Sequence, residues 1–185
     1  AAQVTAMMQD LGMAGGQFTV QVSPAAQPGA AGVDDIEFHI AGHAGQTPKP
    51  LGKVASGGEL SRIALAIAVT TSAMGSAGTL IFDEVDAGIG GAVAQTVGRL
   101  MQQLGQERQV LAVTHLPQVA ACADHHLVVS KQHSPAGASS TVVPATGTER
   151  VAEVARMLGG EKLSRASLAH AREMLGEGVP APETE

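Results

Sequence analysis

Apolar and polar residues alternate in two short segments near the beginning of the chain, over residues 18–22 and 36–40. A period of two is typical of strands that have one buried and one exposed face. The segment between them, residues 23–34, is rich in Pro, Ala and Gly and is predicted to be a loop. The pattern therefore predicts two antiparallel strands that are joined by this loop.

Apolar positions at helical spacing predict helices in the rest of the chain. The predicted helices cover residues 1–12, the run from Gly58 onward, and residues 93–104, 117–123, 148–158 and 164–175. The run after Gly58 is apolar nearly all round, which is typical of a buried helix. The segment 93–104 has one polar face, which indicates a helix that covers one side of a sheet. Thr148 is expected to cap the helix that stops at Gly159.

Short apolar runs between these helices predict further strands. They cover residues 79–82, 109–114, 126–131 and 141–145. The polar stretch 132–139, which contains Pro and Gly, is predicted to be a loop. Strands that alternate with helices predict an α/β fold with a largely parallel sheet flanked by helices, preceded by the antiparallel strand pair.

Composition and charge narrow the possible partners. The chain of 185 residues has a net charge of −6 and contains neither Trp nor Tyr. An acidic domain that is poor in aromatic residues is a poor nucleic-acid binder by itself, so any contact with DNA is expected elsewhere or in a local patch. No apolar run is long enough to span a bilayer, so no membrane partner is expected. The single cysteine, Cys122, excludes an internal disulfide and is typical of a reducing cytosol.

The first candidate site is the sequence Ser56-Gly57-Gly58-Glu59, which opens the apolar helix. The start of a helix has unpaired N–H groups and the positive end of the helix dipole, and glycines let an anion approach the backbone. A phosphate group suits such a site. The ordinary alternative is a capped helix start that binds no ligand.

Two further candidate sites lie where predicted strands end. Asp83 and Glu84 follow the run 79–82, and His115 follows the run 109–114. Open α/β sheets bind their ligands at the carboxyl ends of the strands. Because neighbouring residues of a strand point to opposite sides, the two carboxylates are expected to have different roles. The ordinary alternative is a set of solvated side chains at strand ends.

The order and spacing of these three pieces resemble the C-terminal half of an ABC-type ATPase head, in the form found in SMC-like DNA-repair proteins. The strings VASGGELSR, IFDEVDAGIGG and THLPQVA carry the resemblance, which covers nearly the whole chain. It implies that residues 1–16 are the end of a returning coiled-coil arm and that residues 17–176 form the C-terminal lobe of the head. Residues 177–185 are expected to be a disordered tail. The chain begins at Ala1 instead of a methionine, which suggests a fragment of a longer protein.

The resemblance also implies a role for each candidate residue. The signature motif Ser56-Gly57-Gly58-Glu59 binds the γ-phosphate of ATP held by a second head, so it acts in trans. Asp83 contributes to the Mg²⁺ shell through water, and Glu84 polarises the attacking water. His115 is the switch histidine, which hydrogen-bonds the γ-phosphate. Asp86 lies in the segment that crosses the dimer interface.

One motif of a complete ATP site is missing from the chain. A phosphate-binding P-loop, or Walker A motif, reads G-x-x-x-x-G-K-[ST]. The Gly52-Lys53 pair is followed by Val54 and has Thr47 where the first glycine belongs. The fragment alone is therefore expected to bind ATP poorly and to hydrolyse it negligibly.

The resemblance implies ATP and Mg²⁺ as cofactors and two protein partners. One is the N-terminal lobe of the same head, which carries the Walker A motif. The other is a second head in an ATP-sandwiched homodimer. DNA is expected to bind through the full-length protein, in the cytoplasm at the nucleoid.

Two other functions stay open. A nucleotide-binding subunit of an ABC transporter has similar motifs, but such subunits usually have a proline where this chain has Val85. A non-catalytic dimerisation module keeps the fold but has no need for Asp83, Glu84 and His115 together. A metal site is disfavoured, because one cysteine is too few and the spacing matches no tetrahedral zinc pattern in Cys122, Asp124, His125 and His126.

Overall fold

The computed structural model describes residues 1–30, 32–53, 56–72, 77–134, 137–160 and 163–176. The chain divides into two compact units, Ala1–Thr114 and His115–Glu185, and each is described by itself. The predicted tail at 177–185 lies outside the described residues, and the predicted arm boundary at residue 16 stays a prediction. Among the described residues, none of the helices has both the length and the apolar character needed to cross a membrane.

The first unit begins with helix α1 (Ala2–Asp10) and an antiparallel hairpin of β1 (Gln17–Gly29) and β2 (Gly32–Ala41). A short strand β3 (Lys49–Pro50) pairs with the C-terminal end of β2, and the 3₁₀ helix η1 (Leu51–Lys53) follows it. The antiparallel pair predicted from alternation is confirmed. The hydroxyl of Thr5 in α1 donates to the carbonyl of Phe18 at 3.2 Å, which fixes the helix to the base of the hairpin.

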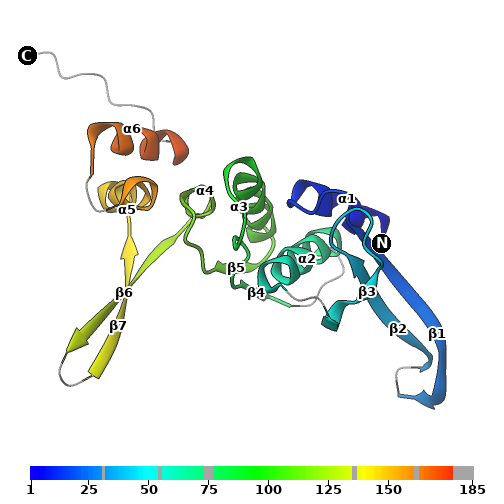
Figure 1. The fold of residues 1–185 in the computed structure, drawn as a ribbon. Coiled ribbons are helices and arrows are strands. Elements are labelled where there is room, and N and C mark those ends of the chain that lie inside the picture. The colour runs from blue at the N-terminus through cyan, green and yellow to red at the C-terminus, as the bar shows by residue number, and fades with distance from the viewer. Residues whose placement is uncertain (31, 54–55, 73–76, 135–136, 161–162, 177–185) are drawn as a thin grey trace, which may run out of the picture. The chain divides into compact units, whose positions relative to one another are not determined.

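The hairpin is longer than predicted, and the loop predicted at residues 23–34 is wrong. Pro24 lies opposite Asp34, within paired strands, and the register shifts between Pro24 and Gly29. Proline is tolerated here because β1 has a single neighbouring strand, so one side of its backbone needs no ladder bond. Figure 1 shows the hairpin extending away from α1. Its base is buried, with Phe18 at 5% exposure, whereas Ile36 nearer the tip is 67% exposed.

The rest of the first unit alternates helices and strands. Helix α2 (Gly57–Thr70) is followed by β4 (Thr79–Phe82), α3 (Gly91–Gly105) and β5 (Gln109–Ala112), and β4 pairs with β5 in parallel. The predicted α/β class is confirmed, and in the described residues β4 and β5 form its parallel part. Helix α3 packs against β5 with an apolar face, as predicted. Helix α2 is less buried than predicted, because Leu60 is 41% exposed.

One face of the parallel pair is apolar and open to solvent. Phe82 is buried, but Ile81, Leu111 and Val113 are 69%, 44% and 63% exposed. Parallel strands are normally covered on both faces. The first unit therefore carries a sheet that is incomplete by itself.

The second unit contains α4 (Pro117–Ala121), the antiparallel hairpin of β6 (His126–Ser134) and β7 (Gly137–Ala145), α5 (Gly147–Gly159) and α6 (Arg165–Met174). Its small core lies between the last two helices and consists of Val151, Val154, Ala155 and Ala171. The loop predicted at residues 132–139 is wrong, because the described part of this stretch belongs to the two strands. Cross-strand partners such as Ser130 and Thr141, whose hydroxyls are 2.7 Å apart, extend the pairing.

The ends of the last two helices test the predicted caps. Helix α5 begins after Thr146 and not at Thr148, because the Thr146 carbonyl already accepts from the N–H of Glu149 at 3.0 Å. Its predicted stop at Gly159 and Gly160 is confirmed. Helix α6 starts at a capping box in which Ser164 and Ser167 bond each other's backbone N–H groups.

Candidate functional site

The start of α2 is a capped helix N-terminus. The hydroxyl of Ser56 accepts a hydrogen bond from the Glu59 N–H at 3.4 Å, and the Ser56 carbonyl accepts from the Leu60 N–H at 3.0 Å. Ser56 and Gly57 are exposed, whereas Gly58 is buried. The first N–H groups of a helix have no partner within the helix, and the dipole makes this end positive. The local geometry therefore suits an anion, and the predicted phosphate contact stays a prediction.

The acidic pair lies in a bend and not in the strand itself. Strand β4 ends at Phe82, so the argument from alternating strand residues does not apply to Asp83 and Glu84. Both side chains are exposed, while the next residue, Val85, is fully buried. The Ala87 N–H donates to the Glu84 carbonyl at 3.0 Å and closes a tight turn. Buried Val85 thus anchors a turn that presents two carboxylates to solvent.

Glu84 has an unusual backbone conformation. Its φ is +55°, and it is the one non-glycine residue with positive φ among the described residues. Non-glycine residues in this left-handed region cost free energy and are enriched at functional sites, where the surrounding structure maintains them. The backbone of the candidate catalytic glutamate is therefore held in an uncommon conformation by its neighbours.

The N-terminal half of α2 lies directly against this turn. A Cβ atom added to Gly57 would lie 2.6 Å from Glu84 Oε2, and one added to Gly58 would lie 2.9 Å from the Ala87 carbonyl oxygen. The hydroxyl of Ser61 donates to the Asp83 carbonyl at 2.6 Å. The two glycines thus permit a close approach that a side chain would prevent. The structure brings the Ser-Gly-Gly sequence and the acidic pair together in one place.

Arg62 completes the contact between helix and turn. Its Nη1 donates to the Ala87 carbonyl at 2.8 Å and to the Val85 carbonyl at 3.4 Å. The side chain is 5% exposed, and burial lowers its pKa from the ordinary value, against an opposing effect of the Glu59 charge. Sequence reasoning did not single out Ser61 or Arg62, although both stand inside the motif string.

The side chain of Asp86 is buried inside the first unit. It is 2% exposed, and its carboxylate accepts a hydrogen bond from the hydroxyl of Thr114. This bond joins the turn after β4 to the segment that follows β5. Thr114 was also missed by sequence reasoning, because nothing in the sequence shows this contact. The predicted place of Asp86 at a dimer interface stays a prediction.

His115 follows Thr114 in the sequence and is the first residue of the second unit. Its side chain is exposed. Its predicted contact with a γ-phosphate stays a prediction.

The exposed carboxylate of Asp83 fits a magnesium ion that is held mainly by a nucleotide. Mg²⁺ commonly binds through one or two protein carboxylates, together with water and phosphate oxygens. Asp83 directly follows the carboxyl end of β4, and its backbone carbonyl accepts a hydrogen bond from Ser61 of α2. When Mg²⁺ is bound, it neutralises phosphate charge. The exposed Asp83 carboxylate therefore suits a contact with a nucleotide-bound Mg²⁺ ion.

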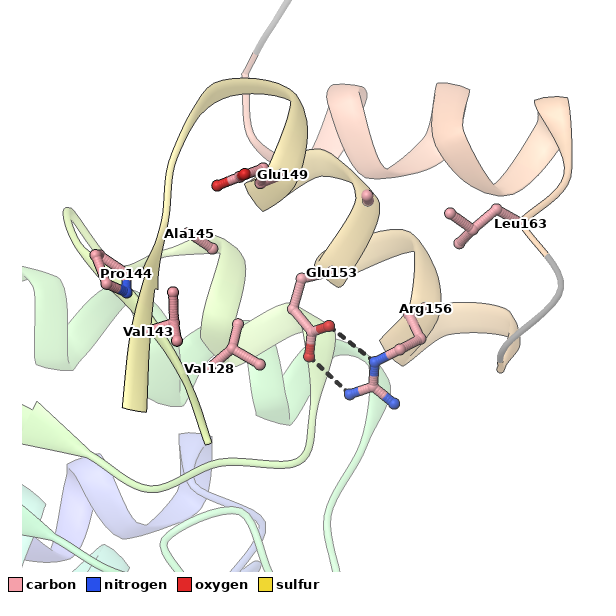
Figure 2. A pocket seen from close by; sticks show the side chains of 9 residues that line it. Val128, Val143, Pro144, Ala145, Glu149, Glu153, Arg156 and Leu163 are labelled. Carbon is pink, nitrogen blue, oxygen red and sulfur yellow. Dashed lines mark hydrogen bonds and ion pairs between the residues drawn. The ribbon is translucent and has the colours of Figure 1, made fainter. Parts of the chain in front are cut away.

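The second unit has an open groove of about 560 Å³ between the β6–β7 hairpin and α5. Figure 2 shows its apolar side chains, among them Val128, Val143 and Leu163, beside a carboxylate and a guanidinium that face each other. These two groups, Glu153 and Arg156, are joined by hydrogen bonds of 2.8 Å and 2.7 Å. The bond to Arg156 lowers the pKa of Glu153. Because this pair is satisfied internally, the groove carries no assigned chemistry.

Comparisons with known proteins identify relatives that match this chain along almost its whole length. It is 43% identical to the DNA repair protein RecN of Treponema pallidum over 96% of the chain and 32% of the relative. It is 46% identical to RecN of Xylella fastidiosa over 94% of the chain and 31% of the relative, and 45% identical to RecN of Mycobacterium leprae over 95% and 33%. The chain thus spans about a third of the length of these curated relatives. A comparison with protein-family models gives no match.

Solved structures with a similar fold are SMC head domains. The Smc head domain with a coiled coil and joint from Pyrococcus yayanosii has a TM-score of 0.59 at 25% identity, over 80% of this chain and 27% of that chain. A chain from work on the ATP-driven dimerisation and DNA-stimulated activation of SMC ATPases has a TM-score of 0.50 at 24% identity, over 80% and 84%. The resemblance to SMC-like DNA-repair proteins is confirmed, and these curated relatives are RecN proteins.

Proposed function

We propose that this chain is the C-terminal lobe of an SMC-like ATPase head that acts in DNA repair. It matches about a third of the length of the RecN proteins and shares the fold of SMC head domains. In the full-length protein, ATP joins two heads and its hydrolysis releases them. DNA binds through the full-length protein, which acts in the cytoplasm at the nucleoid. The relatives' names support a role in DNA repair, and repair of double-strand breaks by recombination is the process that we propose.

The observation that carries the proposal is the contact between the start of α2 and the turn after β4. Gly57 leaves no room for a side chain beside the Glu84 carboxylate, so the phosphate-binding helix start and the acidic pair adjoin. Ser56 and the N–H groups of α2 bind the γ-phosphate of ATP held by a second head. Asp83 contributes a carboxylate toward Mg²⁺, through water.

Glu84 is the residue that acts on the attacking water. Its carboxylate accepts a hydrogen bond from that water and orients it toward the γ-phosphate, while the exposed position leaves room for both. His115 donates a hydrogen bond to the γ-phosphate and loses it when the phosphate leaves. Loss of this bond, and of the bonds at Ser56, weakens the contact between heads.

The open face of the parallel strands supports a missing N-terminal lobe. Ile81 of β4, Leu111 of β5 and Val113, which follows β5, are exposed apolar side chains. Burying such side chains stabilises a protein by about 1.5–3 kcal/mol each, so a covering lobe has a strong driving force. The same lobe supplies the Walker A motif and its lysine, which this chain lacks.

The experiment that tests this function is Mg²⁺-ATP turnover by the chain alone and after mixing with the matching N-terminal lobe. We expect no turnover by the chain alone and turnover in the mixture. The variant Glu84→Gln is expected to form dimers in ATP without turnover. The amide is similar in size to the carboxylate, so ATP still binds, but an amide does not activate the attacking water. Equal turnover by the chain alone, or by the variant mixture, contradicts the proposal.

A further inference from the structure

Arg62 is a buried cation that binds backbone carbonyls. The residue is 5% exposed, and its guanidinium donates to the carbonyls of Ala87 and Val85 at 2.8 Å and 3.4 Å. Its Nε atom is buried and has no hydrogen-bond partner among the described residues. Burying a charge is costly, and an apolar side chain of similar size fills the same space without this cost. The arrangement therefore calls for a role beyond packing.

The carbonyls that α2 binds stand on both sides of Glu84. Ser61 donates to the carbonyl of Asp83 at 2.6 Å, immediately before it. Arg62 donates to carbonyls of residues after it, in the same turn. Glu84 itself has a φ of +55°, a conformation that needs outside support. Two consecutive residues of α2 thus bind carbonyls before and after the strained glutamate, at Asp83 on one side and at Val85 and Ala87 on the other.

The same region of α2 is in contact with the turn at its very first residues. A Cβ on Gly58 would lie 2.9 Å from the Ala87 carbonyl oxygen and 3.1 Å from Arg62 Nη1. Glycine, guanidinium and carbonyl are therefore packed without intervening space. A movement of the helix start by a few tenths of an ångström is transmitted to the turn, because close-packed groups cannot absorb it.

We propose that Arg62 is a positioning residue that couples the phosphate-binding start of α2 to the orientation of Glu84. The inference rests on the proposed function, in which Ser56 touches ATP held by the second head while Glu84 acts on ATP held by its own head. Arg62 and Ser61 then connect the two ATP sites of a dimer through one chain. ATP bound at one site sets the glutamate at the other, which makes turnover cooperative in ATP.

The test uses the full-length protein with the variants Arg62→Met, Arg62→Lys and Ser61→Ala. The matched control is Arg99→Met, because Arg99 is an exposed arginine on α3. Four quantities are measured: kcat, KM, the Hill coefficient for Mg²⁺-ATP, and the ATP concentration at which dimers form in a Glu84→Gln background. Hydrogen exchange of residues 83–88 reports the turn directly.

We expect Arg62→Met to lower kcat by about 10- to 100-fold, the loss typical of a catalytic group displaced by up to 1 Å. The Hill coefficient falls toward one, exchange of the turn accelerates, and dimers still form at nearly the same ATP concentration. Arg62→Lys recovers part of the loss, because an ammonium group reaches the Ala87 carbonyl but cannot span both carbonyls. Ser61→Ala has a smaller effect of the same kind, and the control behaves as wild type.

Unchanged kcat and Hill coefficient in Arg62→Met overturn the inference, and so does a loss of kcat matched by an equal loss of dimers. If Arg62→Met does not fold, Arg62→Lys and Ser61→Ala decide by the same criteria. Wild-type protein without turnover overturns the proposed function and this inference together. Wild-type turnover that the variants leave unaltered overturns the inference alone.

Discussion

Gly57 is expected to matter for turnover and hardly at all for stability. It is the first residue of α2, where alanine is sterically allowed. A Cβ at this position lies 2.6 Å from Glu84 Oε2, against at least 3.4 Å for an ordinary contact. In the variant Gly57→Ala the carboxylate therefore retreats by about 0.8 Å, and a displacement near 1 Å costs about 100-fold in rate.

The fold should tolerate this change. The displaced atom is the end of an exposed, flexible side chain, which rotates at a cost of about 0.5–1.5 kcal/mol. Replacing a helical glycine by alanine raises the free energy of unfolding by about 0.4–1 kcal/mol. The two terms nearly cancel, so the free energy of unfolding should stay within about 1 kcal/mol of the wild type.

Gly58 provides the matched control. Its added Cβ lies 2.9 Å from the Ala87 carbonyl oxygen and 2.9 Å from the Ala87 Cβ, and backbone cannot rotate away. Overpacking of this kind costs about 1–3 kcal/mol, so Gly58→Ala should lower the melting temperature where Gly57→Ala does not.

The assay combines thermal unfolding with Mg²⁺-ATP turnover of the full-length protein. Dimer formation in ATP is measured in parallel, to separate a loss of phosphate binding at α2 from a loss of glutamate positioning. Gly57→Ala with full turnover refutes the placement of Glu84 against the helix. Equal destabilisation by both variants refutes the distinction between a side-chain and a backbone contact.

Two further predictions concern buried groups. Thr114→Val removes a donor to the buried Asp86 carboxylate and should destabilise the protein by about 1–3 kcal/mol in urea unfolding. Thr114→Ser keeps the hydroxyl and should destabilise the protein less. Equal destabilisation by the two variants contradicts a stabilising role for this hydrogen bond. Burial, aided by the Arg150 charge, lowers the pKa of His126 below the ordinary 6.5, so the folded state resists protonation of this side chain. The free energy of unfolding is therefore highest above pH 6.5 and decreases as the pH falls toward the pKa of His126 in the folded protein. Thermal unfolding between pH 7.5 and 5.5 should show this slope in the wild type and in His125→Ala, which alters an exposed histidine, but a weaker slope in His126→Leu.

Local pattern predicted the elements of this fold well and their ends poorly. Helix α3 and the first hairpin follow directly from apolar spacing. Most described residues of the loops expected at 23–34 and 132–139 belong to strands, because cross-strand pairing overrides the turn preference of Pro and Gly wherever the backbone has a partner. Thr148 has the chemistry of a cap, but the backbone turn at Thr146 comes first.

The candidate site shows the same limit. Asp83, Glu84 and the Ser-Gly-Gly sequence were predicted from motif spacing, and the structure brings them together in the first unit. The positive φ of Glu84, the carbonyl contacts of Arg62 and the burial of Asp86 were not predictable. Each depends on which residue of α2 or β5 meets the turn, and this register is set by tertiary packing.

The central claim is that this lobe completes an ATP site on another head. Two full-length variants test it: Ser56→Arg, which blocks the helix start, and a variant of the Walker A lysine in the N-terminal lobe. Each variant alone should be inactive. Mixed in equal amounts they should recover at most about a quarter of wild-type turnover, because half of the dimers contain both variants and each of these has one intact site of two. Coupling between the two sites lowers the recovered turnover below this limit. A mixture that stays inactive, or turnover by Ser56→Arg alone, contradicts the account.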